Sequence, residues 1–353
     1  MDYVIKENKT YKILNSEHVN YRFNKVDGTM ITYGKTLKDD PDWSPMGPFI
    51  SDIEISTICH GPNGIPCSWC YKSNTSTGKN MSLETFKILF SKLPRALVQI
   101  AFGLGSLTHN GELVNPDLWK IMEYCRRHEV IPNITINGDN MTPEIAHKLV
   151  NLCGAVAVSL YDYNQCCDTV KMLTELGLTQ CNIHVLLCQE NYDKCIDIMK
   201  AQEHDPRLSK MGAIVFLMLK QKGRGINSIP IGDWNYQQII NYAMDNNIRV
   251  GFDSCGANKF LEAIKDRPDY EQMKILVEPC ESTCFSYYID VNGIGHPCSF
   301  AEGCCDYKGI NVLEAKDFIK DVWNHEETLR FRKKCLENCR KCILYDLGEH
   351  QHG

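Results

Sequence analysis

The chain has 353 residues, an apolar content of 43% and a formal net charge of −6 at pH 7. This length fits one large domain or two ordinary ones, and the acidic balance does not favour a nucleic-acid partner. No apolar run is long enough to span a membrane, and the N-terminal residues lack the features of a signal peptide. Because 19 cysteines occur without a secretion signal, the sequence predicts a cytoplasmic protein whose thiols bind metal or react.

The first 50 residues are expected to form a short β segment and a linker. Tyr21 and Phe23 alternate with polar residues, Asp27 and Gly28 have turn composition, and a second alternating stretch follows. This is the pattern of a β-hairpin. A Pro- and Asp-rich linker follows, and we expect the whole segment to cap the end of a barrel or to shape a substrate entrance.

From residue 51 onward, predicted strands and helices alternate, which is typical of a parallel sheet with crossover helices. Ser82 and Thr142 have the composition of helix N-caps. The strands are expected at residues 53–58, 97–105, 132–138, 154–161, 181–188, 212–220 and 248–255. The predicted fold class is therefore α/β, a partial (β/α)6 barrel of the TIM type over residues 51–257, with functional groups at the carboxyl ends of the strands.

Three cysteines follow the first predicted strand in a loop rich in glycine and proline: Cys59, Cys67 and Cys70. Seven residues separate the first two and two separate the last two. Three thiolates on one loop can hold three irons of a [4Fe–4S] cluster, which leaves the fourth iron without a protein ligand. A structural zinc site normally needs four ligands, so zinc would have to recruit His60 or a remote cysteine. From this loop alone, both metal centres stay open.

Polar residues or glycines also end the other predicted strands, and parallel strands bring their carboxyl ends to one rim. A glycine-rich turn there would let the backbone approach a ligand closely. The residues are Gly103, Leu104, Gly105 and Ser106 on the second strand, Asn137 on the third, Ser159 on the fourth, His184 and Glu190 near the fifth, and Lys220 on the sixth. Each has an ordinary structural explanation alone, and their agreement on one edge is what indicates a site.

The cysteine loop resembles that of radical S-adenosylmethionine (SAM) enzymes, whose motif ends in Cys-x-aromatic-Cys. Here that ending is Cys67-Ser68-Trp69-Cys70, although the first gap is seven residues instead of the usual three. The turn at residues 103–106 is similar to the family's Gly-Gly-Glu motif but lacks its Glu. The resemblance covers residues 50 to 255 and implies that the three cysteines bind a [4Fe–4S] cluster. It also implies that SAM is bound by Trp69, Gly103, Leu104, Gly105, Ser106, Asn137 and Ser159.

The resemblance implies a reaction as well. A reduced cluster transfers an electron to SAM, the sulfonium carbon–sulfur bond breaks, and a 5'-deoxyadenosyl radical abstracts hydrogen from the substrate. The cofactor supplies the chemistry, while the protein places it and excludes water. An electron donor such as flavodoxin or ferredoxin is then implied as a partner.

The C-terminal third carries a second set of cysteines. Cys280, Gly293 and Cys298 occur with gaps of twelve and four residues, and Asn292 and Gly293 form the predicted turn of a hairpin. This spacing resembles the auxiliary-cluster extensions called SPASM and twitch, so residues 258–353 are expected to form such a small α+β domain. The resemblance implies at least one auxiliary iron–sulfur cluster, of the [4Fe–4S] type, on Cys280, Cys298, Cys339 and Cys342. The alternate ligands, or a second set, are Cys284, Cys304, Cys305 and Cys335. A zinc knuckle is the other interpretation.

The remaining cysteines divide into two groups. Cys255 follows an apolar strand and would face the barrel cavity, where it is predicted to donate a hydrogen atom to a substrate radical or to ligate a cluster; simple burial is the alternative. Seven others lie among apolar residues and are expected to be buried as small hydrophobes: Cys125, Cys153, Cys166, Cys167, Cys181, Cys188 and Cys195.

The substrate is the least defined part of the prediction. Enzymes with such extensions often crosslink, epimerise or oxidise a peptide or protein side chain, and we expect this class. A small metabolite or nucleoside is the alternative substrate, and a zinc-stabilised binding protein without redox chemistry is the alternative class. The basic loop at residues 219–225 is expected to be solvated or to contact an acidic or peptide substrate.

Overall fold

The computed structural model describes residues 2–304 and 306–345 of the chain. Its strands are β1 (Tyr3–Glu7), β2 (Tyr11–Ser16), β3 (Asn20–Asn24), β4 (Met30–Tyr33), β5 (Ile50–Glu54), β6 (Gln99–Gly103), β7 (Thr108–His109), β8 (Glu112–Leu113), β9 (Ile131–Ile136), β10 (Val156–Ser159), β11 (Cys181–Leu187), β12 (Ile214–Met218), β13 (Val250–Phe252), β14 (Ser286–Ile289), β15 (Ile294–His296) and β16 (Ile310–Asn311).

Its α-helices are α1 (Leu83–Lys92), α2 (Leu118–Arg127), α3 (Pro143–Leu152), α4 (Tyr163–Glu175), α5 (Tyr192–His204), α6 (Asp233–Asp245), α7 (Ala257–Ile264), α8 (Tyr270–Lys274) and α9 (Glu326–Glu337). Its shorter helical turns are η1 (Pro62–Gly64), η2 (Gln189–Asn191), η3 (Pro206–Leu208), η4 (Gly223–Asn227), η5 (Ser254–Gly256), η6 (Val312–Glu314) and the π-helical η7 (Ile319–Trp323). Among the described residues, no helix is long and apolar enough to cross a membrane.

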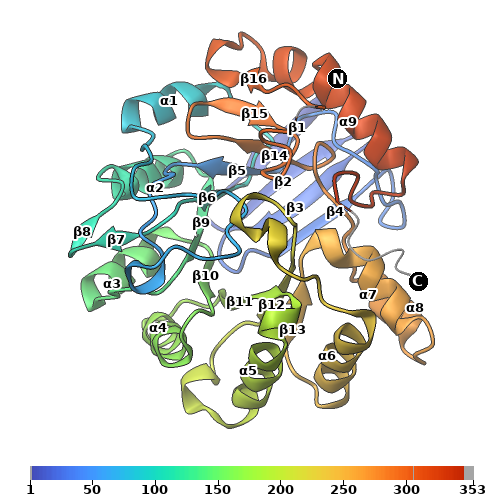
Figure 1. Ribbon diagram of the computed structural model, residues 1–353. Coiled ribbons are helices and arrows are strands. Elements are labelled where there is room, and N and C mark those ends of the chain that lie inside the picture. Colours follow the sequence, from blue (N-terminus) through green and yellow to red (C-terminus); the bar gives the residue numbers. More distant parts are fainter. Residues whose placement is uncertain (1, 305, 346–353) are drawn as a thin grey trace.

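One large sheet organises the chain, with strand order β13-β12-β11-β10-β9-β6-β5-β14-β15-β16. The strands from β13 to β14 are all parallel neighbours, and β15 and β16 continue the sheet antiparallel. Helices α1 to α6 lie around the outside of this curved sheet (Figure 1). The predicted partial α/β barrel is confirmed, because a helix follows each of the six parallel strands β5, β6, β9, β10, β11 and β12 in the chain.

The alternation of buried and partly buried residues along β11 shows which face of the sheet packs against the helices. In β11, Cys181, Ile183 and Val185 are fully or almost fully buried, while the residues between them, including His184, are only partly buried. Alternate side chains of a strand point to opposite faces, so the buried set packs against the helices and the other set faces the barrel interior. All seven cysteines that were expected to be simple core residues are buried.

The first barrel strand ends earlier than the sequence predicts. We expected it at residues 53–58, but it runs from Ile50 to Glu54. Beyond it the backbone pairs with the returning arm of the cysteine loop: the Thr57 amide donates to the carbonyl of Lys79 at 3.0 Å. The Ile-rich composition is that of a strand, but these residues form the base of a loop.

The N-terminal segment forms a four-stranded antiparallel sheet, β1 to β4. The predicted hairpin is confirmed as β3 and β4, with two further strands before it. The hydroxyl of Tyr21 donates to the carbonyl of Ala96 at 3.0 Å, and Lys12 Nζ donates to that of Leu97 at 2.7 Å, just before β6. The sheet therefore closes the amino-terminal end of the barrel and lies behind it in Figure 1, away from the strand ends that carry the candidate site.

The C-terminal extension shares the barrel sheet. Strand β14 runs parallel to β5, with Ser286 opposite Ile50 and Ile289 opposite Ile53. The predicted hairpin turn at Gly293, whose φ is +79°, connects β14 to β15. The strands of the expected barrel (residues 51–257) and of the expected extension (residues 258–353) thus belong to one hydrogen-bonded sheet.

Candidate functional site

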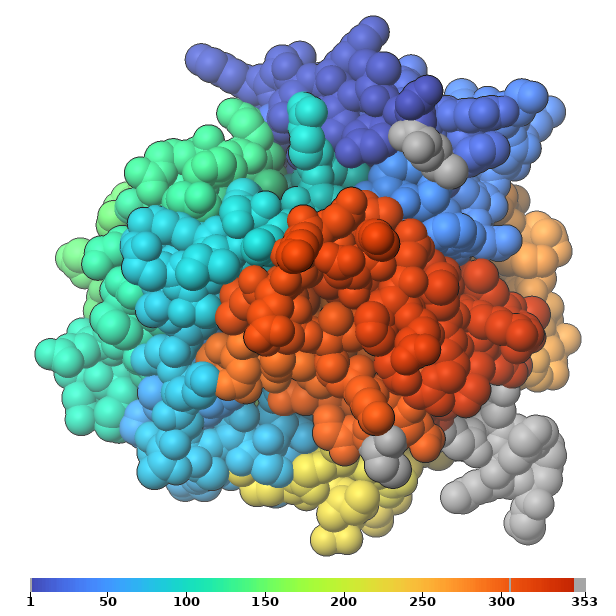
Figure 2. All heavy atoms as spheres, turned by 90° about the horizontal axis from the view of Figure 1, so that it is seen from above, coloured from blue at the N-terminus to red at the C-terminus, as the bar shows by residue number. Residues whose placement is uncertain are grey.

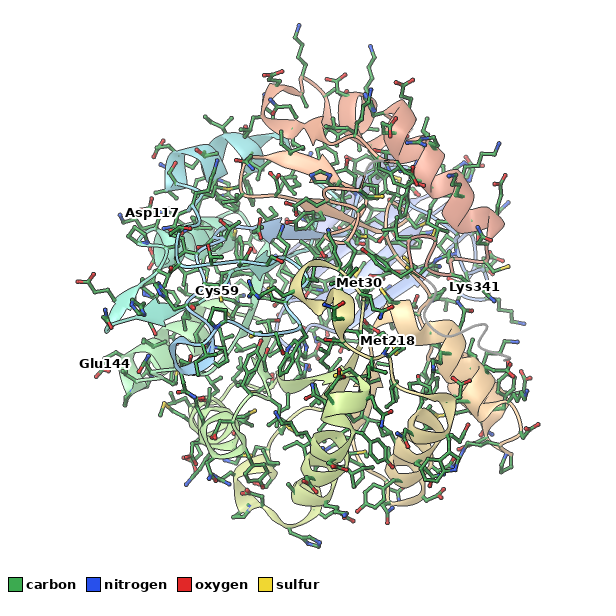
Figure 3. All side chains as sticks on the ribbon, viewed as in Figure 1. Met30, Cys59, Asp117, Glu144, Met218 and Lys341 are labelled. Atoms are coloured by element: carbon green, nitrogen blue, oxygen red, sulfur yellow. The ribbon has the colours of Figure 1, made fainter. Side chains whose placement is uncertain are left out.

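The cysteine loop leaves the carboxyl end of β5 and is closed at its base by backbone pairing. The amide of Cys59 donates to the carbonyl of Thr75 at 2.8 Å. The amide of Met81, at the end of the loop, donates to the carbonyl of Ile55 at 2.9 Å. These bonds hold the loop at the rim of the barrel. In Figure 3, Cys59 lies on the inner side of the helix ring, whereas Asp117 and Glu144, near the starts of α2 and α3, lie at its outer edge.

The seven-residue gap folds into the compact turn η1. A Cβ atom on Gly61, whose φ is +75°, would lie 1.9 Å from the carbonyl oxygen of Ile65, so only glycine fits this reversal. The amide of Asn63 donates to Asp139 Oδ2 at 3.1 Å, just beyond the end of β9. The unusual gap is therefore an ordered turn that is anchored to the rim.

The glycine-rich turn after β6 packs directly on the first cysteine. A Cβ atom on Gly105 would lie 2.4 Å from Cys59 Cβ and 2.3 Å from the carbonyl oxygen of Ile58. The buried Ser106 hydroxyl accepts from the amide of His60 at 3.0 Å and lies 3.8 Å from Cys59 Sγ. Gly103 and Leu104 precede this contact, and the carbonyl of Gly103 accepts from the amide of Ile55 at 2.8 Å.

Two aromatic rings flank the second cysteine. Trp69 stacks on Tyr161 with ring centroids 6.3 Å apart and an interplanar angle of 12°, and Lys194 Nζ lies 5.9 Å from the Trp69 ring centre. Tyr161 follows β10 and hydrogen bonds to the thiol of Cys67. Burial raises the pKa of Cys67, and the hydrogen bond from Tyr161 opposes that rise because it stabilises the thiolate.

The two polar rim residues differ in their availability. Asn137 is used locally: its Nδ2 donates to Asp139 Oδ2 at 2.8 Å, and its Oδ1 accepts from the Asp139 amide at 3.1 Å. Ser159 ends β10 two residues before Tyr161 and is half-buried, opposite His184 of β11. Both positions lie at the predicted rim. The side chain of Asn137 is used within its own turn, whereas that of Ser159 is not.

The three cysteines are close enough to influence one another, since Cys59 and Cys70 both raise the pKa of Cys67. Within residues 2–304 and 306–345, no group of three or more Cys, His, Asp or Glu side chains converges on a single-ion position. A cubane cluster does not need such convergence, because each cysteine binds its own iron. The three half-buried thiols on one loop, around a glycine-lined approach, fit that donor set.

A second group of cysteines lines a cavity of about 180 Å³ between the barrel and the extension. The cysteines at this cavity are Cys255, Cys280, Cys298, Cys335 and Cys342. Of the four predicted auxiliary ligands, three are thus brought together. The fourth, Cys339, is exposed and is not among the cavity-lining residues. The alternate Cys305 lies outside the described residues.

A thiol network connects three of the cysteines. The thiol of Cys335 hydrogen bonds to both Cys280 and Cys284, which lowers the pKa of these two cysteines and raises that of Cys335. This places two of the alternates, Cys284 and Cys335, next to the predicted ligand Cys280.

Cys255 lies in η5 and lines the same cavity. Burial raises its pKa, while the nearby ammonium of Lys220 opposes that rise. Lys220 is buried, forms an ion pair with Asp253, and lies 4.9 Å from the ring centre of Phe300. Lys220 thus lies beside Phe300, which lines the cavity, but it is not itself among the lining residues.

A buried ionic group that the sequence did not indicate connects the cysteine loop to the extension. Lys72, two residues after Cys70, forms ion pairs with Glu54 (3.2 Å) and Glu302, and donates to the Tyr288 hydroxyl at 2.9 Å. The two carboxylates come from β5 and from the segment after β15. No local sequence pattern relates the positions of these ionic partners. Tyr161 is different, because an aromatic residue at the end of the fourth predicted strand could have been recognised as a residue of the rim.

No protein-family model matches the chain, and no curated protein sequence matches it. Several solved structures are similar to it. Streptococcus suis SuiB bound to precursor peptide SuiA is 13% identical with a TM-score of 0.65, covering 95% of this chain and 93% of that one. SuiB bound to S-adenosylmethionine is 15% identical with a TM-score of 0.59, covering 82% and 70%.

A second similar structure is anSMEcpe with bound AdoMet and Cp18Cys peptide, which is 16% identical with a TM-score of 0.59, covering 85% of this chain and 88% of that one. SuiB and anSMEcpe are radical SAM enzymes of the SPASM or twitch type. The likeness shows that the chain has the fold of these enzymes, as its sequence predicts.

Proposed function

We propose that this protein, which has the fold of radical SAM enzymes, uses SAM to abstract hydrogen from a peptide or protein side chain. The observation that carries the proposal is the position of Cys59, Cys67 and Cys70. They stand on one ordered loop at the carboxyl end of β5, beside the Trp69–Tyr161 pair. This is where a parallel α/β barrel carries its functional groups.

When bound, a [4Fe–4S] cluster with SAM at its open iron would supply the reductive cleavage of SAM to a 5'-deoxyadenosyl radical. The chain's own residues do the rest. The three cysteines hold the cluster, the Trp69 ring offers a flat surface to the adenine, and Ser159 offers a hydroxyl at the rim. The close approach of Gly105 to Cys59 packs the turn after β6 against the cysteine loop.

The substrate assignment rests on the fold and the extension. SuiB is solved with a precursor peptide and anSMEcpe with a peptide, and both match more than four fifths of this chain. The cavity at the junction of barrel and extension is lined by five cysteines, so an auxiliary cluster would lie between barrel and extension. A peptide or protein side chain is therefore the substrate class that we propose, with an external reductant such as flavodoxin or ferredoxin as electron donor.

The test is anaerobic reconstitution with iron and sulfide, followed by SAM and a chemical reductant. We expect a brown protein that forms 5'-deoxyadenosine. A colourless protein that binds only zinc would overturn the proposal. Incubation with peptide and metabolite pools then separates the substrates: deuterium transfer into 5'-deoxyadenosine from labelled peptides supports the peptide assignment, and transfer only from small molecules contradicts it.

A further inference from the structure

The loop after β12 contacts the cysteine loop through one arginine. Arg224 Nε donates to the carbonyl of Cys67 at 2.8 Å, Nη1 donates to that of Asn74 at 3.0 Å, and its backbone amide donates to that of Cys70 at 3.0 Å. A single residue thus holds three carbonyls around the cysteine pair. Figure 2 shows this yellow segment lying against the light-blue cysteine loop.

The two glycines beside Arg224 make this contact sterically possible. A Cβ atom on Gly223 would lie 2.4 Å from the carbonyl oxygen of Tyr71 and 2.7 Å from that of Cys70. On Gly225 it would lie 2.8 Å from the carbonyl oxygen of Trp69. Any side chain at these positions would push the two loops apart, so the Gly-Arg-Gly sequence allows backbone to lie on backbone.

One nitrogen of the same guanidinium has no partner. Arg224 Nη2 is buried and makes no hydrogen bond to any described residue. A buried charged donor without a partner is costly, because the hydrogen bonds that it made to water are not replaced. The other two nitrogens are fixed on carbonyls of the loop that carries the three cysteines, so the free N–H group is available to an acceptor held by that loop.

We propose that residues 223–225 are a clamp for the cysteine loop, in which Arg224 positions Cys67 and Cys70 and donates its free Nη2 to a sulfur of the bound cluster. This inference rests on the proposed function, because it assumes a cluster on the three cysteines. It replaces the expectation of a solvated or substrate-binding basic loop. Arginine suits the role because its planar fork reaches two carbonyls and still presents a third donor, which lysine cannot do.

The clamp is tested with Arg224→Met, Arg224→Lys and, as a matched control, Arg126→Lys, which removes an arginine–carbonyl hydrogen bond to Leu152 on the outer side of the barrel. Each reconstituted full-length protein is treated with an iron chelator, and the loss of the SAM-responsive cluster signal is followed. We expect loss to be about tenfold faster in both Arg224 variants, as the removal of a charge-assisted hydrogen bond predicts. Arg126→Lys should behave as the wild type.

The midpoint potential of the same cluster gives an independent measurement. A nearby cation stabilises the more negative reduced cluster, so Arg224→Met should shift the potential to a more negative value, and Arg224→Lys should shift it less. Apo-protein unfolding curves identify any variant that does not fold, in which case Arg224→Lys carries the test. Wild-type loss rates and potential in both variants would overturn the clamp, whereas a wild type without the cluster would instead overturn the proposed function.

Discussion

Arg224 Nε lies 2.8 Å from the carbonyl oxygen of Cys67, although 157 positions separate the two residues in the sequence. This hydrogen bond joins the loop after the sixth barrel strand to the loop after the first. The candidate cluster site is therefore held from both sides: Gly105 and Ser106 pack on Cys59, and Arg224 fixes Cys67 and Cys70. The predictions below concern this arrangement, the cysteine-lined cavity and the barrel interior.

Substituting the clamp glycines should loosen the cysteine loop without removing any hydrogen-bonding side chain. In Gly225→Ala, the new methyl group would meet the Trp69 carbonyl, so we expect less iron per chain after reconstitution. Gly232→Ala is the matched control, because its Cβ would meet nothing within 4 Å and its φ is likewise not positive. Iron and sulfide assays on both variants check this. Equal iron in the two variants would contradict the close contact.

The cavity predicts which cysteines hold an auxiliary cluster. Cys298→Ser and Cys255→Ser should each lower the iron content and the auxiliary spectroscopic signal, because both residues line the cavity with Cys280 and Cys342. Cys339→Ser should leave the iron content close to wild type, because Cys339 is exposed and lies outside the cavity lining.

Two outcomes would change this ligand set. Loss of iron in Cys339→Ser, with full iron in Cys255→Ser, would restore the set that the sequence resemblance implies. If Cys255→Ser keeps its iron but no longer forms product while still cleaving SAM, Cys255 is instead the hydrogen-atom donor. Electron paramagnetic resonance of the reduced variants separates these results from simple misfolding.

His184 should make folding stability depend on pH. It faces the barrel interior from β11, and burial lowers its pKa from 6.5 to about 4. Between these values the unfolded chain binds a proton that the folded chain does not, so stability falls as pH falls through this window. The contribution is at most about 3 kcal/mol and smaller where water enters the barrel.

Comparison of the wild type with His184→Gln isolates this effect, since all other titrating groups are common to both. Urea unfolding of the apo proteins at several pH values between 4 and 7 should show the variant gaining stability relative to the wild type as pH decreases. Parallel curves for the two proteins across this range would contradict a lowered pKa for His184.

The sequence predicted the elements that depend on local patterns. Alternating βα units, the N-caps at Ser82 and Thr142, and the cysteine loop at a strand end all follow from residues close in the chain. Contacts between distant segments could not be read in this way. Neither the parallel pairing of β14 with β5 nor the acceptors of Arg224 leaves a local signal, because backbone carbonyls are present at every position.

The end of the first barrel strand also depends on contacts between distant segments. Ile55 and Ile58 have strand composition, yet the strand ends at Glu54. The amide of Ile55 still donates to Gly103 of β6, but its carbonyl accepts from the amide of Met81 on the returning arm of the loop. Which segment supplies the pairing is decided by tertiary structure rather than by β-propensity.

The most direct test of the account is formation of 5'-deoxyadenosine by the reconstituted wild type and by Cys67→Ala. We expect the wild type to cleave SAM when reduced, and the variant to form none while it keeps the iron of the cysteine-lined cavity. Equal 5'-deoxyadenosine from both proteins would contradict the assignment of Cys59, Cys67 and Cys70 as the ligands of the SAM-binding cluster.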